Sequence, residues 1–193
     1  MRTLVFATNN KNKIEEIREV IIGRFQILTL QEAGINIDIP EPYNTIEANA
    51  SEKSRTIHKL LGQNCFSEDS GLETEALNGA PGVKSARYAG EKASDGENIA
   101  KLLYIMENYT NRTARFKTVI SLIFNNKEFL FEGLCPGHIK YEQTGSGGFG
   151  YDSIFVPEGS TKTFAEMSMD EKNLFSHRKK AVVKLLNFLK ANG

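Results

Sequence analysis

The segment from residue 144 to residue 155, TGSGGFGYDSIF, constrains the backbone of this chain more than any other segment does. Four of its residues are glycine, which packs no side chain and loses more conformational entropy on ordering than other residues do. Such a cluster indicates unusual backbone angles or the close approach of a ligand. The rings of Phe149 and Tyr151 offer faces to a planar base, and Asp152 offers acceptors to ring N–H or sugar hydroxyl groups. A glycine-rich hairpin without a ligand is the alternative.

Strand and helix patterns alternate along the chain and predict an α/β fold on a mixed sheet. Apolar runs predict strands at residues 4–7, 25–30 and 65–67, and β-branched and aromatic residues predict an antiparallel hairpin of strands 115–124 and 127–133. Helical spacing predicts helices at residues 13–22, 45–61 and 94–109, and from residue 168 onward. No repeat or long linker interrupts the 193 residues, so we expect a single domain, or two lobes that share one sheet.

Composition excludes several classes of protein. Lys plus Arg and Asp plus Glu number 24 each, so the charge gives no reason to expect a nucleic-acid or anionic-membrane partner. The first apolar run is too short for a signal peptide, and none approaches the roughly 18 residues of a spanning helix, which predicts a cytoplasmic protein. Cys65 and Cys135 lie far apart without metal-ligand spacing, so we interpret both as buried apolar residues.

Residues 8–13, TNNKNK, lie between the first predicted strand and the first predicted helix. At such a place the backbone N–H groups and the helix dipole favour an anion. Thr8 and Asn10 can donate hydrogen bonds, and Lys11 and Lys13 add positive charge, so phosphate is the natural ligand. The glycines of a Walker motif are absent. A polar turn with asparagine caps is the alternative interpretation.

Glu68 and Asp69 are adjacent carboxylates that follow a predicted buried strand and precede Ser70. We expect both to face one cleft. Hard oxygen ligands suit Mg²⁺, and a carboxylate beside the ion can orient or deprotonate an attacking water. Glu41, in a proline-rich loop, is a further candidate ligand. The alternative is a solvated acidic pair, with Glu41 as a surface charge.

Near the end of the chain, Lys172, Ser176, His177 and Arg178 form a cationic and polar group. On a continuous helix Arg178 would face inward, because it falls in register with Leu174, Val182, Leu185 and Leu189. A nucleobase carbonyl or a phosphate would then serve as its acceptor. The alternatives are a structural salt bridge, or a helix that begins at Ser176 as its N-cap. A capping-box pattern at residues 168–171 leaves an earlier helix start open as well.

Taken together, six motifs resemble the inosine/xanthosine triphosphate pyrophosphatase family. In chain order they are Thr8-x-Asn10-x-x-Lys13, Glu68-Asp69-Ser70-Gly71-Leu72, Gly79-Ala80-Pro81-Gly82, Ser85-Ala86-Arg87-Tyr88, Gly147-Gly148-Phe149-Gly150-Tyr151-Asp152 and Ser176-His177-Arg178. The resemblance implies a two-lobed fold on a long mixed sheet flanked by helices, a nucleotide site between the lobes, and a homodimer. It also implies Mg²⁺-dependent hydrolysis of dITP, ITP and XTP to the monophosphate and pyrophosphate.

The resemblance also implies roles for particular residues. Asp69 would act as base and metal ligand, Glu41 as second ligand, Glu68 as a further candidate ligand, and Ser70 would contact the substrate. The phosphates would be held by Thr8, Asn9, Asn10, Lys11, Asn12 and Lys13. The base and sugar would be surrounded by Phe149, Gly150, Tyr151, Asp152, Lys172, His177 and Arg178.

Two alternatives are open, the first with related chemistry on a similar fold and the second from another class. A Maf-like pyrophosphatase for modified pyrimidine nucleotides is disfavoured by the Ser176-His177-Arg178 tail. A non-catalytic nucleotide-binding sensor is disfavoured by the retained Glu68 and Asp69.

Overall fold

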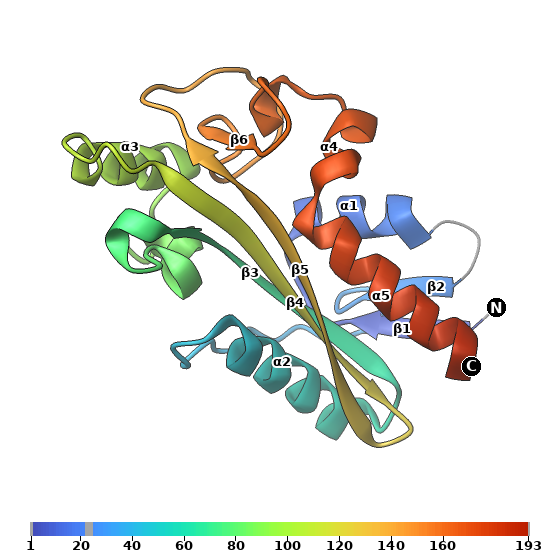
Figure 1. Ribbon diagram of the computed structural model, residues 1–193. Helices are drawn as coiled ribbons and strands as arrows, with labels where there is room; N and C mark the ends of the chain where they lie inside the picture. Colours follow the sequence, from blue (N-terminus) through green and yellow to red (C-terminus); the bar gives the residue numbers. More distant parts are fainter. Residues whose placement is uncertain (1, 22–24, 193) are drawn as a thin grey trace. The chain divides into compact units, whose positions relative to one another are not determined.

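The structure, a computed structural model, describes residues 2–21 and 25–192. Its sheet has the strand order β2-β1-β3-β4-β5-β6 (Figure 1). The strands are β1 (Arg2–Phe6), β2 (Phe25–Thr29), β3 (Cys65–Thr74), β4 (Thr113–Phe124), β5 (Lys127–Ile139) and β6 (Phe155–Pro157). Because β1 is parallel to β2 and β3 whereas β5 is antiparallel to β6, the predicted mixed sheet is confirmed.

The helices also follow the predicted pattern, with shifts of a few residues at their ends. They are α1 (Lys11–Ile21), α2 (Ile46–Leu61), α3 (Asp95–Ile105), α4 (Met169–Phe175) and α5 (His177–Asn192). Ile22, the last residue of the first predicted helix, lies outside the described residues. Thr45 caps α2 by accepting from the backbone N–H of Ala48, and Ser94 caps α3 in a capping box with Glu97. No helix in the described part of the chain is long and apolar enough to cross a membrane.

Asn125 and Asn126 form the turn between β4 and β5. Their φ angles are 51° and 62°, and a two-residue hairpin turn of this kind requires positive φ at both positions. Asparagine tolerates this conformation better than most side chains do. The hairpin predicted around these two residues is therefore confirmed.

The chain divides into two compact units. The first unit comprises residues 1–69, 118–133 and 178–193, and the second comprises residues 70–117 and 134–177. Three strands, β3, β4 and β5, contribute residues to both units.

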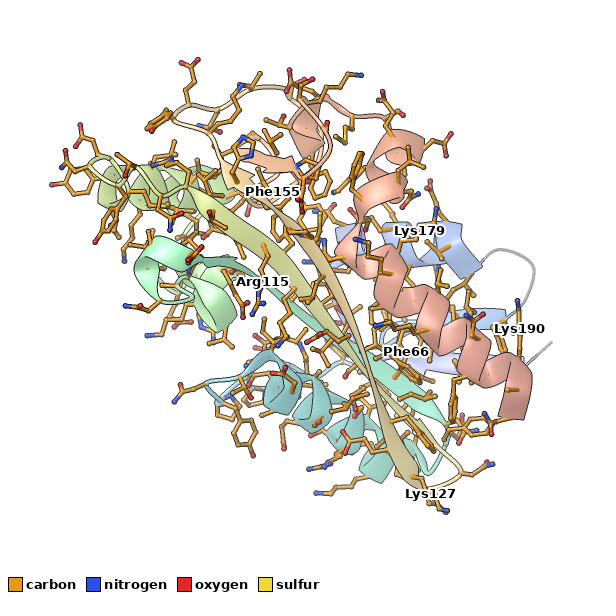
Figure 2. All side chains as sticks on the ribbon, in the orientation of Figure 1. Phe66, Arg115, Lys127, Phe155, Lys179 and Lys190 are labelled. Atoms are coloured by element: carbon orange, nitrogen blue, oxygen red, sulfur yellow. The ribbon has the colours of Figure 1, made fainter. Side chains whose placement is uncertain are left out.

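Alternate residues at positions 4–7, in β1 and directly after it, supply the two cores of the first unit. Leu4 and Phe6 pack with α1 and α5, whereas Val5 and Ala7 pack with Ile57 of α2. This alternation is expected where helices cover both faces of parallel strands. Figure 1 shows α2 on the other side of these strands from α5. Phe66 of β3, labelled in Figure 2, belongs to the α1 and α5 face and stacks on Phe6 with 4.5 Å between ring centroids.

The second unit has a core of its own, which is rich in aromatic residues. Phe116 of β4 packs against Phe155 of β6 and Phe164, with ring centroids 4.7 and 6.0 Å away. Ile99 and Leu102 of α3 join the same cluster. Both cysteines are buried and free, as expected, and burial raises the pKa of the Cys65 thiol to about 12, which leaves it unreactive.

The C-terminal segment resolves the helix start that the sequence left open. Ser168 caps α4 in a capping box with Glu171, and Ser176 then interrupts the helix with φ −49° and ψ 122° before α5 begins. Of the alternatives that the sequence left open, the helix broken at Ser176 is the one present, and the continuous register does not extend to Leu174, which is 74% exposed. Arg178 is nevertheless buried, as predicted, because it lies on the face of α5 that carries Val182 and Leu185.

Candidate active site

The two adjacent carboxylates lie inside β3 rather than after a strand. The predicted strand ended at residue 67, whereas β3 continues to Thr74. Successive side chains of a strand point to opposite faces, so Glu68 and Asp69 cannot share one face. Glu68 has the parity of Phe66 and meets partners from α1 and α5, while Asp69 meets a partner from α2. The two carboxylates therefore have different partners, and their common cleft stays a prediction.

Asp69 and Glu41 are joined by a lysine of α2. The Lys53 Nζ lies 2.6 Å from Glu41 Oε1 and 3.1 Å from Asp69 Oδ1. Lys53 and Asp69 are 7% and 5% exposed, so this is a buried ion pair rather than a solvated one. The alternative of a solvated pair does not hold for Asp69.

Lys53 was not predicted as a site residue, although its spacing with apolar residues of α2 indicates a buried position. It lies on the buried stripe of α2 with Ile46, Ala50 and Ile57, at spacings of four, three and four residues. A lysine in an inward position needs a partner, by the same argument that singled out Arg178. The spacing of residues in α2 therefore predicts a buried Lys53 with a carboxylate partner.

Glu68 is the centre of a second buried network. Arg178 donates to Glu68 Oε1 from Nη2 at 3.2 Å, and the Lys13 Nζ lies 3.3 Å from Oε2. Thr118 of β4 donates to Oε1 at 3.2 Å. Arg178 also pairs with Glu16 of α1, which the sequence did not single out. The salt bridge considered for Arg178 is thus present, and its proposed contact with a base stays a prediction.

The two carboxylates of β3 have opposite pKa shifts. Burial raises the pKa of Asp69 and outweighs Lys53, whose single charge is shared with Glu41. Burial also disfavours the charge on Glu68, but Arg178 and Lys13 outweigh it and hold the pKa of Glu68 well below its usual range. Asp69 is therefore the better proton acceptor of the two.

The loop at residues 8–13 caps the start of α1 with its own side chains. Asn10 Oδ1 accepts from the backbone N–H of Lys13 at 3.2 Å, and Thr8 Oγ1 accepts from Asn10 at 3.2 Å. Asn9 donates to the carbonyl of Ile37. Asparagine capping is therefore present in the structure. Exposed Lys11 and half-buried Lys13 keep the positive charge expected of a phosphate site at this helix end.

The glycine-rich segment belongs to the second unit, and its own chain explains two of its glycines. A Cβ on Gly145 would lie 2.6 Å from the carbonyl carbon of Ala165, and one on Gly148 would lie 2.2 Å from Asp152 Oδ2. Asp152 Oδ2 accepts from the backbone N–H of Phe149 and from the Lys172 Nζ, at 3.0 and 2.7 Å. Close packing of the protein on itself therefore requires these glycines, whether or not a ligand also approaches.

The rings of the predicted base-binding residues in this unit differ in their exposure and their contacts. Tyr151 is 3% exposed and donates its hydroxyl to the carbonyl of Ser85, so it is part of the core. Phe149 is half-buried, with the Lys172 Nζ 5.2 Å from its ring centroid. His177 stacks on Phe116 at 4.8 Å. Phe149 is thus the ring of this segment that keeps accessible surface.

A surface pocket elsewhere in the second unit holds none of the predicted site residues. It has a volume of about 330 Å³ and is lined by residues 87–91 with Lys84 and Lys101. Two of its three cations have partners, since Lys101 donates to the carbonyl of Tyr88 and Arg87 pairs with Glu91. We therefore place the candidate site at the buried carboxylates and not at this pocket.

This α/β protein is similar over its whole length to solved structures of Ham1 proteins. The structure entitled "The structure of the Staphylococcus aureus Ham1 protein" matches with a TM-score of 0.91 and 38% identity over 100% of both chains. A dITP/XTP pyrophosphatase structure from Mycobacterium abscessus matches with a TM-score of 0.79 and 35% identity, over 95% of this chain and 98% of that one.

Sequence comparison gives the family. The Ham1 family model matches residues 4–188. A dITP/XTP pyrophosphatase of Flavobacterium psychrophilum is 51% identical over 187 residues, which cover 97% of this chain and 98% of the relative. The chain belongs to the Ham1 family, and the family resemblance predicted from its motifs is confirmed.

Proposed function

We propose that this protein hydrolyses dITP, ITP and XTP to the nucleoside monophosphate and pyrophosphate. The observation that carries the proposal is the group of half-buried Glu41 with buried Lys53 and Asp69, in which the lysine ammonium contacts both carboxylates. Relatives that match nearly the whole chain bear the name dITP/XTP pyrophosphatase, which supports the same substrates here.

The residues fit a magnesium ion. In the described ranges, 2–21 and 25–192, no cluster of three or more His, Cys, Asp or Glu side chains could hold a metal by itself. Mg²⁺ commonly takes only one or two carboxylates and completes its shell with water and substrate phosphates. Glu41 and Asp69 would supply that pair, and the ammonium of Lys53 between them supports a cation at this position. When bound, the ion would neutralise phosphate charge and polarise the phosphorus that is attacked.

Asp69 is the residue for proton transfer. Its raised pKa makes its carboxylate more basic than that of a solvated aspartate, so it can accept a proton from a water that attacks the α-phosphorus. Lys13 and the first turn of α1 bind the triphosphate and orient it for in-line displacement of pyrophosphate. The protein forms no covalent intermediate in this scheme.

Selection of the base depends on donors to the 6-oxo group. Lys172, His177 and Arg178 can donate to this oxygen, whereas adenine carries an amino group there that would leave the donors unpaired. Each unpaired buried donor costs roughly 1–3 kcal/mol. Lys172 donates to Asp152 in the structure, so this pair also fixes the orientation of the ammonium.

A nucleotide panel tests the proposal. Pyrophosphate release from dITP, ITP, XTP, ATP, GTP and modified pyrimidine triphosphates is measured with Mg²⁺ or with EDTA. We expect the inosine and xanthosine nucleotides to be preferred and Mg²⁺ to be required. Asp69→Asn should abolish turnover, whereas Asp170→Asn, at an exposed position of α4, should not. Turnover of modified pyrimidines alone, or near-normal activity of Asp69→Asn, would contradict the proposal.

The homodimer implied by the resemblance and the cytoplasmic location expected from the apolar runs of the sequence remain predictions. Light scattering on the purified protein tests the first, and fractionation of cells tests the second. A monomer at micromolar concentration would contradict the expected dimer.

A further inference from the structure

Lys53 forms ion pairs with the same two carboxylates that we propose as metal ligands. Its Nζ is 2.6 Å from Glu41 and 3.1 Å from Asp69, and its side chain is 9% exposed. The ammonium is held by the buried face of α2, where Ser54 and Ala50 bond to β4 and β3. Lys53 is therefore fixed between the carboxylates rather than sampling solvent near them.

A divalent ion cannot share this place with the ammonium. Mg²⁺ binds oxygen at about 2.0–2.1 Å, so an ion held by both carboxylates would stand where Lys53 now makes its contacts. A Mg²⁺ ion and the Lys53 ammonium at the same carboxylate oxygens would repel each other, and burial strengthens the repulsion because little water screens it. The ion and the ammonium group consequently compete for Glu41 and Asp69.

Charge also favours an exchange over joint occupancy. Glu41 and Asp69 bring two negative charges and Lys53 brings one positive charge, so the group retains one negative charge. A divalent ion in place of the ammonium balances both carboxylates.

We propose that the ammonium group of Lys53 occupies the cation position in the nucleotide-free protein, and that a divalent cation binds Glu41 and Asp69 only by displacing it. Lys53 is thereby an internal competitor of the metal, which keeps the affinity for the ion low until the ammonium moves away. This inference rests on the proposed function, since Glu41 and Asp69 are the ligands named there.

Binding of Mn²⁺ to the nucleotide-free protein tests the inference without any measurement of activity. The free ion is followed by electron paramagnetic resonance during titration of the wild type and of Lys53→Gln, which removes the charge. We expect Lys53→Gln to bind Mn²⁺ at least about tenfold more tightly, within the usual range of coupling between competing sites. Lys59→Gln, an exposed position on the same helix, should bind as the wild type does. Equal or weaker binding by Lys53→Gln that is folded at the start of the titration, as judged by circular dichroism, would overturn the inference.

Two further variants locate the effect. Glu41→Gln in the Lys53→Gln background should abolish the gain, and a gain that persists there would place the ion elsewhere and overturn the inference. Lys53→Arg keeps the positive charge and should bind Mn²⁺ no more tightly than the wild type.

Loss of the ammonium leaves the buried Asp69 and the half-buried Glu41 without a counter-charge, which can unfold Lys53→Gln in the absence of metal. In that case we expect saturating Mn²⁺ to restore the fold, as judged by circular dichroism. A variant that stays unfolded at saturating Mn²⁺ would count against the inference. The nucleotide panel is independent of these titrations: wild-type hydrolysis of ITP with an unchanged Mn²⁺ affinity in Lys53→Gln would reject this inference and leave the proposed function intact.

Discussion

Arg178 directs two donors at one oxygen of Glu68, with Nε at 3.3 Å and Nη2 at 3.2 Å from Oε1. The guanidinium is 3% exposed, and its attraction to Glu68 and Glu16 outweighs burial and raises the pKa of Arg178 further. An arginine predicted to recognise a nucleobase is thus engaged by two carboxylates of its own chain. Its charge stabilises Glu68 in the ionised form, and its part in base selection has to be measured together with this structural role.

Arg178→Leu should therefore have two effects. It leaves the carboxylates of Glu68 and Glu16 without their guanidinium partner, and breaking a buried pair in this way costs about 3–5 kcal/mol of stability. If Arg178 also donates to the 6-oxo group, kcat/KM for ITP and XTP should fall at least roughly tenfold, and for ATP much less. Lys190→Leu, at an exposed position of α5, is the control.

A kinetic panel beside a thermal melt separates the two effects of Arg178→Leu. A lower melting temperature with an unchanged ratio of ITP to ATP activity would reject base recognition and leave the salt bridge as the function of Arg178.

Lys13→Ala should weaken the binding of ITP far more than that of inosine. The Lys13 Nζ lies at the start of α1, where a phosphate is the expected ligand, and inosine has no phosphate. Isothermal titration with both ligands measures the difference. Equal losses for the two ligands would show that the variant disturbs the fold, because Lys13 also lies 3.3 Å from Glu68.

Acid should destabilise the protein through Glu68. Its pKa in the folded state is held below the usual value of about 4.3, so its ion pairs stabilise the fold above that pH. This stability is lost as pH falls below about 4.3 toward the folded-state pKa, because the unfolded chain binds the proton first. Urea unfolding at pH values from 6 to 3 measures the effect. Glu68→Gln should be less stable than the wild type at neutral pH and should lose less stability than the wild type between pH 6 and 3. An equal loss in both proteins would show that Glu68 is not the source of the acid sensitivity.

Gly148→Ala should disturb the second unit more than Gly150→Ala does. Both glycines have positive φ, 73° and 57°, so a side chain at either position costs about 1–2 kcal/mol. Only at Gly148 does a Cβ collide with Asp152, at 2.2 Å from Oδ2, whereas nothing lies within 4 Å at Gly150. Because Asp152 holds Lys172, Gly148→Ala should also raise KM for ITP. Similar melting temperatures for the two variants would show that the collision is relieved without cost.

Much of the fold could be predicted because local chemistry specifies it. The β-branched and aromatic run before Asn125 and Asn126 required a hairpin, and Ser94, Ser168 and Thr45 marked helix starts that the structure confirms. The sequence left the start of the last helix open, because two local signals competed there. Leu174 fits the apolar register of α5, yet Ser176 ends α4 before that register can continue.

The sequence by itself determined the elements, the family motifs and the residue types of the site, since these depend on spacing and on the chemistry of each side chain. Only the tertiary structure decided which charges meet. Glu68 and Asp69 are adjacent in the chain, but the two-residue period of β3 turns one toward Arg178 and Lys13 and the other toward Lys53. Glu16 and Arg178 are 162 residues apart, and no local pattern encodes their pairing. Such contacts arise from the packing of α1, α2 and α5 on the strands, because a buried charge is stable only where packing brings a counter-charge to it.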